Sequence, residues 1–177
     1  MGMLSFTLFD TALGRCAIAW GARGIVAVEL PDRDDAATRR RVRRAFPDAV
    51  DARPPHDVAA AIAAIVRLFA GEPDDLAHVV LDMSEVPEFD RRVYAAARAI
   101  PPGETRSYGE LAAGLGESGA AQAVGRALGR NPIPIIIPCH RVLAADGSLH
   151  GFSAPGGVAT KRRMLAIEGA LAPALFD

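Results

Sequence analysis

The sequence predicts an α+β fold, in which a small sheet with helices precedes a mostly helical second part. Short apolar or alternating runs separated by turn-forming segments fill the first thirty residues, as is typical of antiparallel strands. Later segments have helical periodicity and end at glycine or proline. From Pro87 these amphipathic segments follow one another closely. We therefore place a boundary near residues 80–87 and expect domains over residues 1–80 and 81–177.

The first domain begins with three expected strands and continues with two expected helices. These elements cover residues 3–10, 14–20, 23–30, 36–46 and 55–70. Asp34 and Asp35 precede the first helix, and Pro47 stops it. Five arginines lie between Arg39 and Arg44. We interpret this run as a solvated helix face, with a DNA contact as the less favoured alternative.

The second domain is expected to be built from helices. They cover residues 87–100, 107–115, 120–131 and 158–169. Ser107 and Glu110 have the spacing of a capping box at a helix start. The glycine-containing turn between the two middle helices suggests a helix-turn-helix. Before the last helix lies an apolar, proline-punctuated segment, PIPIIIPCHRV, which we expect to be stiff.

Composition sets few limits on function. A net charge of −1 gives no indication of a nucleic-acid partner, and the excess of arginine over the single lysine, Lys161, is interpreted as compositional bias. No apolar run reaches about eighteen residues and no secretory signal is visible, so we expect a cytoplasmic protein with no membrane contact. Cys16 and Cys139 are expected to be free thiols, with Cys16 packed in a strand. No Cys/His cluster has zinc-like spacing, so no metal is expected.

Cys139 and His140 are adjacent, after a buried-looking apolar run. The thiolate is the nucleophilic form of cysteine, and a nearby histidine is the usual means of producing it. Side chains of neighbouring residues point opposite ways on an extended strand but can be bridged in a tight turn. As a bare dipeptide, the pair is more often structural than catalytic.

The surroundings of this pair are more specific. The stretches GETRSYGELA, RNPIPIIIPCHRV and DGSLHGF, with the segment from Lys161 to Ala170, resemble the O6-alkylguanine-DNA alkyltransferase family across residues 87–170. The first domain fits that family only in outline. The resemblance implies a ribonuclease H-like first domain and a winged helix-turn-helix-like core in the second. It also implies irreversible, single-turnover transfer of an alkyl (methyl) group from O6-alkylguanine in double-stranded DNA to the protein, with O4-alkylthymine left open as a second substrate. No cofactor and a monomer are expected.

The resemblance also implies roles for individual residues. Cys139 matches the alkyl acceptor, and His140 the base that removes its proton through a water. Glu168 matches the acidic residue that orients the histidine, and Tyr108 the tyrosine that donates a hydrogen bond to the base. Asn131 matches a residue that braces the turn around the cysteine, and a helix C-cap is compatible with that role. The substrate pocket is expected to include Asn131, Val142, Phe152 and Ser153.

In the reaction that the resemblance implies, the alkyl carbon lies inside a DNA duplex, so the alkylated guanine must be flipped into a pocket of the protein. The segment over residues 120–131 resembles the recognition helix of the family, and its small residues suit insertion in the minor groove. Gln122 stands where most members carry an arginine that fills the gap left by the base, so weaker DNA affinity or slower flipping is expected. Ala123 lies beside it. Arg126 and Arg130 follow on one face and are expected to contact phosphates, with solvated surface arginines as the alternative.

The sequence also differs from the usual family pattern in the segment HGFSAPGGV, as it does at Gln122. Phe152 stands where the family usually has tyrosine, and Ala154-Pro155 resembles a two-residue insertion. Three other functions stay open at this point. An alkylated-DNA lesion sensor would bind without transfer, a Cys-His hydrolase would need an oxyanion hole of which the sequence gives no sign, and a helix-turn-helix regulator would not require PCHRV or Glu168.

Overall fold

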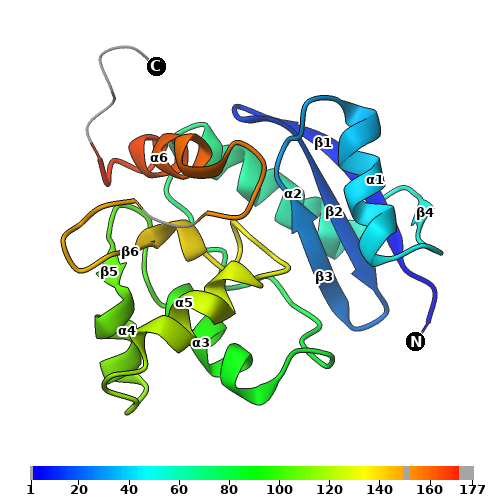
Figure 1. The fold of residues 1–177 in the computed structure, drawn as a ribbon. Helices are drawn as coiled ribbons and strands as arrows, with labels where there is room; N and C mark the ends of the chain where they lie inside the picture. The colour runs from blue at the N-terminus through cyan, green and yellow to red at the C-terminus, as the bar shows by residue number, and fades with distance from the viewer. Residues whose placement is uncertain (1, 150–151, 172–177) are drawn as a thin grey trace.

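The computed structural model describes residues 2–149 and 152–171, and it places a sheet with two flanking helices beside a mostly helical half (Figure 1). The sheet contains β1 (Ser5–Thr11), β2 (Gly14–Gly21), β3 (Gly24–Glu29) and β4 (Val50–Asp51), in the order β3-β2-β1-β4. The first three strands pair antiparallel and confirm the predicted strands. The two-residue β4 pairs parallel to β1 and has no counterpart in the sequence prediction, because two residues carry no periodicity.

The sheet buries both of its faces. Phe6 and Ala19 pack with Val42 of α1 (Asp35–Ala45) on one face. Ile18 belongs to the core on the other face, together with Ile65 of α2 (His56–Phe69). This separation follows from the alternation of side chains along a strand. It also accounts for Cys16, which is a free, fully buried thiol on the α2 face, where burial raises its pKa to about 12.

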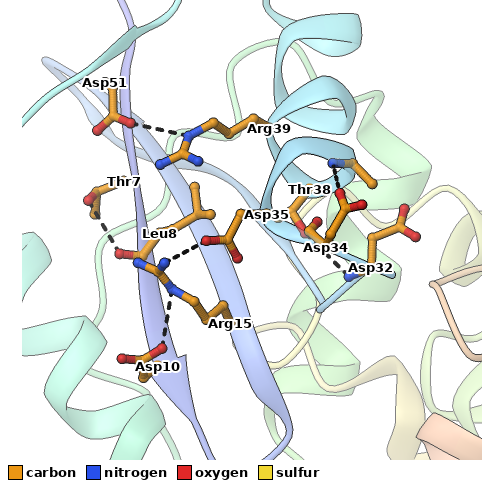
Figure 2. Close-up of polar contacts among 11 residues, drawn as sticks. Thr7, Leu8, Asp10, Arg15, Asp32, Asp34, Asp35, Thr38, Arg39 and Asp51 are labelled. Atoms are coloured by element: carbon orange, nitrogen blue, oxygen red, sulfur yellow. Dashed lines mark hydrogen bonds and ion pairs between the residues drawn. The ribbon is translucent and has the colours of Figure 1, made fainter.

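Helix α1 is tied to the sheet by charged side chains, as Figure 2 shows. Asp34 caps the helix by accepting a 2.7 Å hydrogen bond from the amide of Ala37. Arg15 of β2 pairs with Asp35 at 2.6 Å, and Arg39 pairs with Asp51 of β4 at 3.5 Å. The arginine run is therefore only partly a solvated face.

The second half contains the helices expected there. They are α3 (Glu88–Arg98), α4 (Tyr108–Gly114), α5 (Ala121–Gly129) and α6 (Gly157–Ile167). Both hydrogen bonds of the predicted capping box, between Ser107 and Glu110, are present. Two short strands, β5 (Arg106–Ser107) and β6 (Val142–Leu143), pair in parallel beside the 3-10 helix η1 (Cys139–Arg141). No helix in the described ranges is long and apolar enough to cross a membrane.

The two halves share one hydrophobic core. A single cluster of buried side chains includes Ile18 and Ile65 from the first half and Val93, Val124 and Ile136 from the second. The backbone also joins them. Val28 donates to the carbonyl of Pro132 at 3.1 Å, and the carbonyl of Ile25 accepts from the amide of Asp82 at 2.8 Å. The boundary near residues 80–87 stays a prediction, and the shared core shows that the halves pack directly on each other.

This junction predicts a steric effect at Gly24. Its φ is +133°, and an added Cβ would lie 2.8 Å from the carbonyl oxygen of Val80. Gly24→Ala should lower the free energy of unfolding by about 2 to 4 kcal/mol, because a strained backbone costs roughly 1–3 kcal/mol and the clash adds to it. Gly71→Ala is the matched control, since its φ is +95° and nothing lies within 4 Å. Urea unfolding of both variants checks the difference, and equal losses would contradict the clash.

Candidate active site

The segment between α5 and η1 forms a rigid, buried support for Cys139. Asn131 follows α5 and bridges this segment with its amide group. Its Nδ2 donates to the carbonyl of Ile137 at 2.9 Å, and its Oδ1 accepts from the amide of Ile133 at 2.9 Å. Between these two anchors, Ile135 has a φ of +76°, which is a strained value for a β-branched residue. The asparagine therefore holds a strained turn in place before the cysteine, and the bracing role expected from the resemblance stays a prediction.

Cys139 is a buried thiol at the start of η1, with 9% of its surface exposed. Burial raises the pKa of this thiol, while Asn131, the charge of Lys161 and nearby backbone amides oppose the rise without cancelling it. The resting cysteine is consequently a neutral thiol. A base is required to make it a nucleophile.

His140 lies completely buried beside Cys139. Its Nε2 is 2.8 Å from Oε1 of Glu168, at the C-terminal end of α6. Its Nδ1 is buried and has no hydrogen-bond partner among the described residues. Burial lowers the pKa of His140, and the charges of Arg141 and Lys161 lower it further, against an upward effect of Glu168. A neutral imidazole with its proton on Nε2 leaves Nδ1 able to accept a proton.

Glu168 has a fully buried carboxylate that accepts three hydrogen bonds from two residues. Arg141 donates from Nε to Oε2 at 2.9 Å and from a terminal nitrogen to Oε1 at 2.8 Å, so Oε1 is shared with His140. Burial alone raises the pKa of Glu168. Hydrogen bonds from His140 and Arg141, together with the charges of these two residues, outweigh that effect and bring the pKa to about 2. Glu168 is thus ionised in the folded protein.

Lys161 is a second buried cation near the cysteine, and no helical or strand pattern in the sequence predicts that position. Only 1% of its surface is exposed, and its Nζ donates to the carbonyl of Val142 at 2.7 Å. The same Nζ lies 5.9 Å from the ring centroid of Tyr108. Burial lowers the pKa of Lys161, and it raises the pKa of Tyr108. Being the only lysine in an arginine-rich chain was the one available signal.

A cavity of about 100 Å³ lies beside the thiol. Its wall includes Cys139, Tyr108, Asn131, Phe152 and Ser153, all predicted from the sequence, with Ala154 of the apparent insertion. The first half contributes Val28, Glu29, Leu30 and Arg41, which sequence reasoning did not place here because they lie about a hundred residues from Cys139. Val142 does not line this cavity. Its side chain is in the core, and it borders the site only through the carbonyl that binds Lys161.

Helix α5 presents Gln122 and Arg126 to solvent, with Ala123 half-buried between them. Arg130 was expected to extend this face but has a different partner. Its guanidinium forms a bidentate ion pair with the buried Asp90 of α3, with nitrogen–oxygen distances of 2.9 and 3.1 Å. This contact could not be read from helical spacing because its partner lies forty residues away.

Two further contacts fix the end of α5. The hydroxyl of Tyr94, in α3, donates to the carbonyl of Ala127 at 2.7 Å. Ser153, in the segment that borders the cavity, donates to the carbonyl of Gly129 at 3.0 Å. Helix α5 is therefore anchored both to α3 and to the wall of the cavity.

Residues 88–170 match the family model described as 6-O-methylguanine DNA methyltransferase, DNA binding domain. The methylated-DNA–protein-cysteine methyltransferase of Mycolicibacterium paratuberculosis is 47% identical over 126 residues, which are 70% of this chain and 74% of that protein. The chain belongs to the methylated-DNA–protein-cysteine methyltransferase family.

Solved structures agree with this family assignment over nearly the whole chain. The crystal structure of the O6-methylguanine methyltransferase of Mycobacterium tuberculosis matches with a TM-score of 0.76 and 36% identity, covering 99% of this chain and all of that one. A structure of the M. tuberculosis protein in complex with DNA matches with a TM-score of 0.73 and 34% identity over 96% of each chain. The small sheet with helices and the helical second half are therefore shared with methyltransferases of this family.

The buried carboxylate at this site predicts a loss of stability in acid. Because the pKa of Glu168 is about 2 in the folded state and 4.5 ordinarily, the ionised group stabilises the fold above pH 4.5, and this stabilisation disappears as the pH falls toward 2. At about 1.4 kcal/mol for each pH unit, the loss is about 3 kcal/mol. Urea unfolding at pH 7, 5, 4 and 3 measures it.

Glu168→Gln should be less stable than the wild type at pH 7 and should lose less stability between pH 5 and pH 3. The exposed Glu72→Gln is the control and should follow the wild-type curve. Parallel curves for the wild type and Glu168→Gln would contradict the assignment of this acid sensitivity to Glu168.

Proposed function

We propose that the protein repairs DNA by transferring the alkyl group of O6-alkylguanine to Sγ of Cys139, once per molecule. The observation that carries this proposal is a buried Cys139 thiol followed directly by a buried His140, whose Nε2 is held at 2.8 Å by Glu168, in a chain of the methylated-DNA–protein-cysteine methyltransferase family. It supplies a nucleophile, a base with an unoccupied nitrogen, and a carboxylate that orients the base.

In the proposed reaction, the thiol proton moves from Cys139 to Nδ1 of His140, through a bridging water. The thiolate then attacks the alkyl carbon, so that an S–C bond forms and the C–O6 bond breaks with its electron pair leaving on guanine. Tyr108, in the wall of the same cavity, donates a hydrogen bond that stabilises the developing charge. The product thioether has no carbonyl for water to attack, and the thiol is not regenerated.

The proposed DNA contact is made by α5 and the turn before it. Gly125 of α5 lies against Tyr108, where an added Cβ would be 3.8 Å from the ring, so the helix approaches the first turn of α4 closely. We place Gln122 and Ala123 in the minor groove, where the glutamine fills the space of the flipped base without the charge of an arginine. A winged helix-turn-helix-like arrangement of α4 and α5 with β5 and β6, and a ribonuclease H-like first half, belong to the same proposal. The protein is proposed to act as a monomer on double-stranded DNA.

The proposed transfer is tested by intact and peptide mass analysis after mixing the protein with duplex containing O6-methylguanine. The peptide of Cys139 should gain one methyl group, saturating at one per protein, while undamaged duplex should give no change. Cys139→Ser should bind without gaining mass, and Cys16→Ser should react as the wild type does, because the Cys16 thiol lies in the core under the sheet. Binding of the damaged duplex without any mass gain would instead support a lesion sensor and would point to Gln122 and the Ala154-Pro155 insertion.

The surroundings of Arg126 and Arg130 predict different effects on DNA binding. Arg126→Ala should reduce the slope of log affinity against log salt by about 0.9, because one phosphate contact is lost. Arg130→Ala should leave that slope unchanged and lower the melting temperature, because its guanidinium binds Asp90. Titration of duplex DNA at several salt concentrations distinguishes the two. An equal reduction of the slope in both variants would show that Arg130 leaves Asp90 to bind phosphate.

A further inference from the structure

Arg141, directly after the Cys-His pair, is the most completely buried arginine of the site. Only 2% of its side chain is exposed. All three of its nitrogens donate, two of them to the two oxygens of Glu168 and the third to the carbonyl of Ile100 at 2.7 Å. Arginines are almost never buried to this extent unless they are paired. The fork geometry of the guanidinium fixes the plane of the carboxylate as well as neutralising it.

His140 therefore faces a carboxylate whose charge is already balanced. The charged groups around the imidazole are Glu168 and Lys161 from α6 and Arg141 from η1, with the thiol of Cys139 beside it. A buried histidine next to an unbalanced carboxylate gains a proton, because the ion pair is preferred to an isolated buried charge. A protonated His140 would hold no free lone pair for the proton of Cys139.

We propose that Arg141 is a positioning residue, which keeps His140 neutral with its proton on Nε2 by occupying both oxygens of Glu168. This inference rests on the proposed function, since it concerns the base of the proposed transfer. The lowered pKa of His140, caused by burial and by the charges of Arg141 and Lys161, agrees with it.

The arrangement also keeps the buried charge constant during the reaction. Before the proton moves, Glu168 and Arg141 balance each other, while Cys139 and His140 are neutral. After it moves, the thiolate and the imidazolium balance each other as a second pair. When the S–C bond forms, guanine leaves with the electron pair of the C–O6 bond and takes up a proton, while His140 gives up the proton that it received from Cys139. His140 then ends neutral beside a neutral thioether. The charge of Lys161 is the same throughout, so the net buried charge does not change at any step.

The test compares Arg141→Gln and Arg141→Lys with the wild type. Single-turnover transfer from O6-methylguanine duplex is measured between pH 5.5 and 9, and the pKa of His140 is measured by NMR of 15N-labelled histidine. In Arg141→Gln the pKa of His140 should rise above 7, so that most of the protein carries a protonated His140 at pH 7; transfer at pH 7 should then fall at least about twofold and recover at higher pH. Arg141→Lys keeps the charge and should return the pH profile toward that of the wild type.

Arg98→Gln is the matched control. Its guanidinium also binds main-chain carbonyls, those of Leu76 and Val79, but it contacts neither His140 nor Glu168. This variant should lose stability and keep the wild-type pH profile. An equal loss of transfer at every pH in Arg141→Gln, with an unmoved His140 pKa, would overturn the proposal and leave Arg141 a structural role only.

The wild type gives an independent measurement if Arg141→Gln does not fold. The proposal requires a neutral His140 with its proton on Nε2 between pH 6 and 7.5, and His140→Gln identifies its signals. A charged imidazole, or a proton on Nδ1, would overturn it. Absence of methyl transfer from the wild type at every pH would refute the proposed function, while the titration of His140 would still decide the role of Arg141.

Discussion

The buried carboxylate of Glu168 is the contact on which the geometry of the site depends. It lies at the end of α6, and its two oxygens receive donors from His140 and Arg141 of η1. Arg141 extends the connection to the carbonyl of Ile100, just after α3. A charge without exposure to water must be fully paired, so these three segments can adopt only arrangements that keep the contacts together. The position of the imidazole follows from this requirement.

The cysteine is placed by a second constraint, which acts from the other side. Asn131 binds both ends of the segment before η1 and holds Ile135 at a positive φ. The strain is compatible with a stable fold because the isoleucine is buried and its neighbours are fixed. The thiol is thereby held at the wall of a small cavity, close to a base but in its neutral form. In the proposed function, this combination keeps the protein unreactive until a flipped base enters the cavity.

Helix α5, which we propose contacts DNA, is tied to the cavity through its last turn. Its last turn is held by Tyr94, by the pair of Asp90 with Arg130 and by Ser153, and the last of these belongs to the cavity wall. In the proposed function, a movement of α5 on DNA would therefore shift the cavity wall through the contact with Ser153. The exposed Gln122 and Arg126 lie on the part of the helix that these anchors leave accessible.

The sequence by itself determined the kinds of elements and indicated the candidate reactive residues. Alternation in the first thirty residues gave the three long strands, the capping box gave the start of α4, and the motif around Cys139 gave the family resemblance. These signals are local, so they can be read along the chain. Tertiary structure alone decided the pairing of β4, β5 and β6, the contribution of Glu29 and Arg41 to the cavity, and the burial of Lys161 and Arg141. It also gave Arg130 its partner in Asp90. Each of these depends on residues far apart in sequence meeting in one core, where the cost of burying a charge selects the partner that satisfies it.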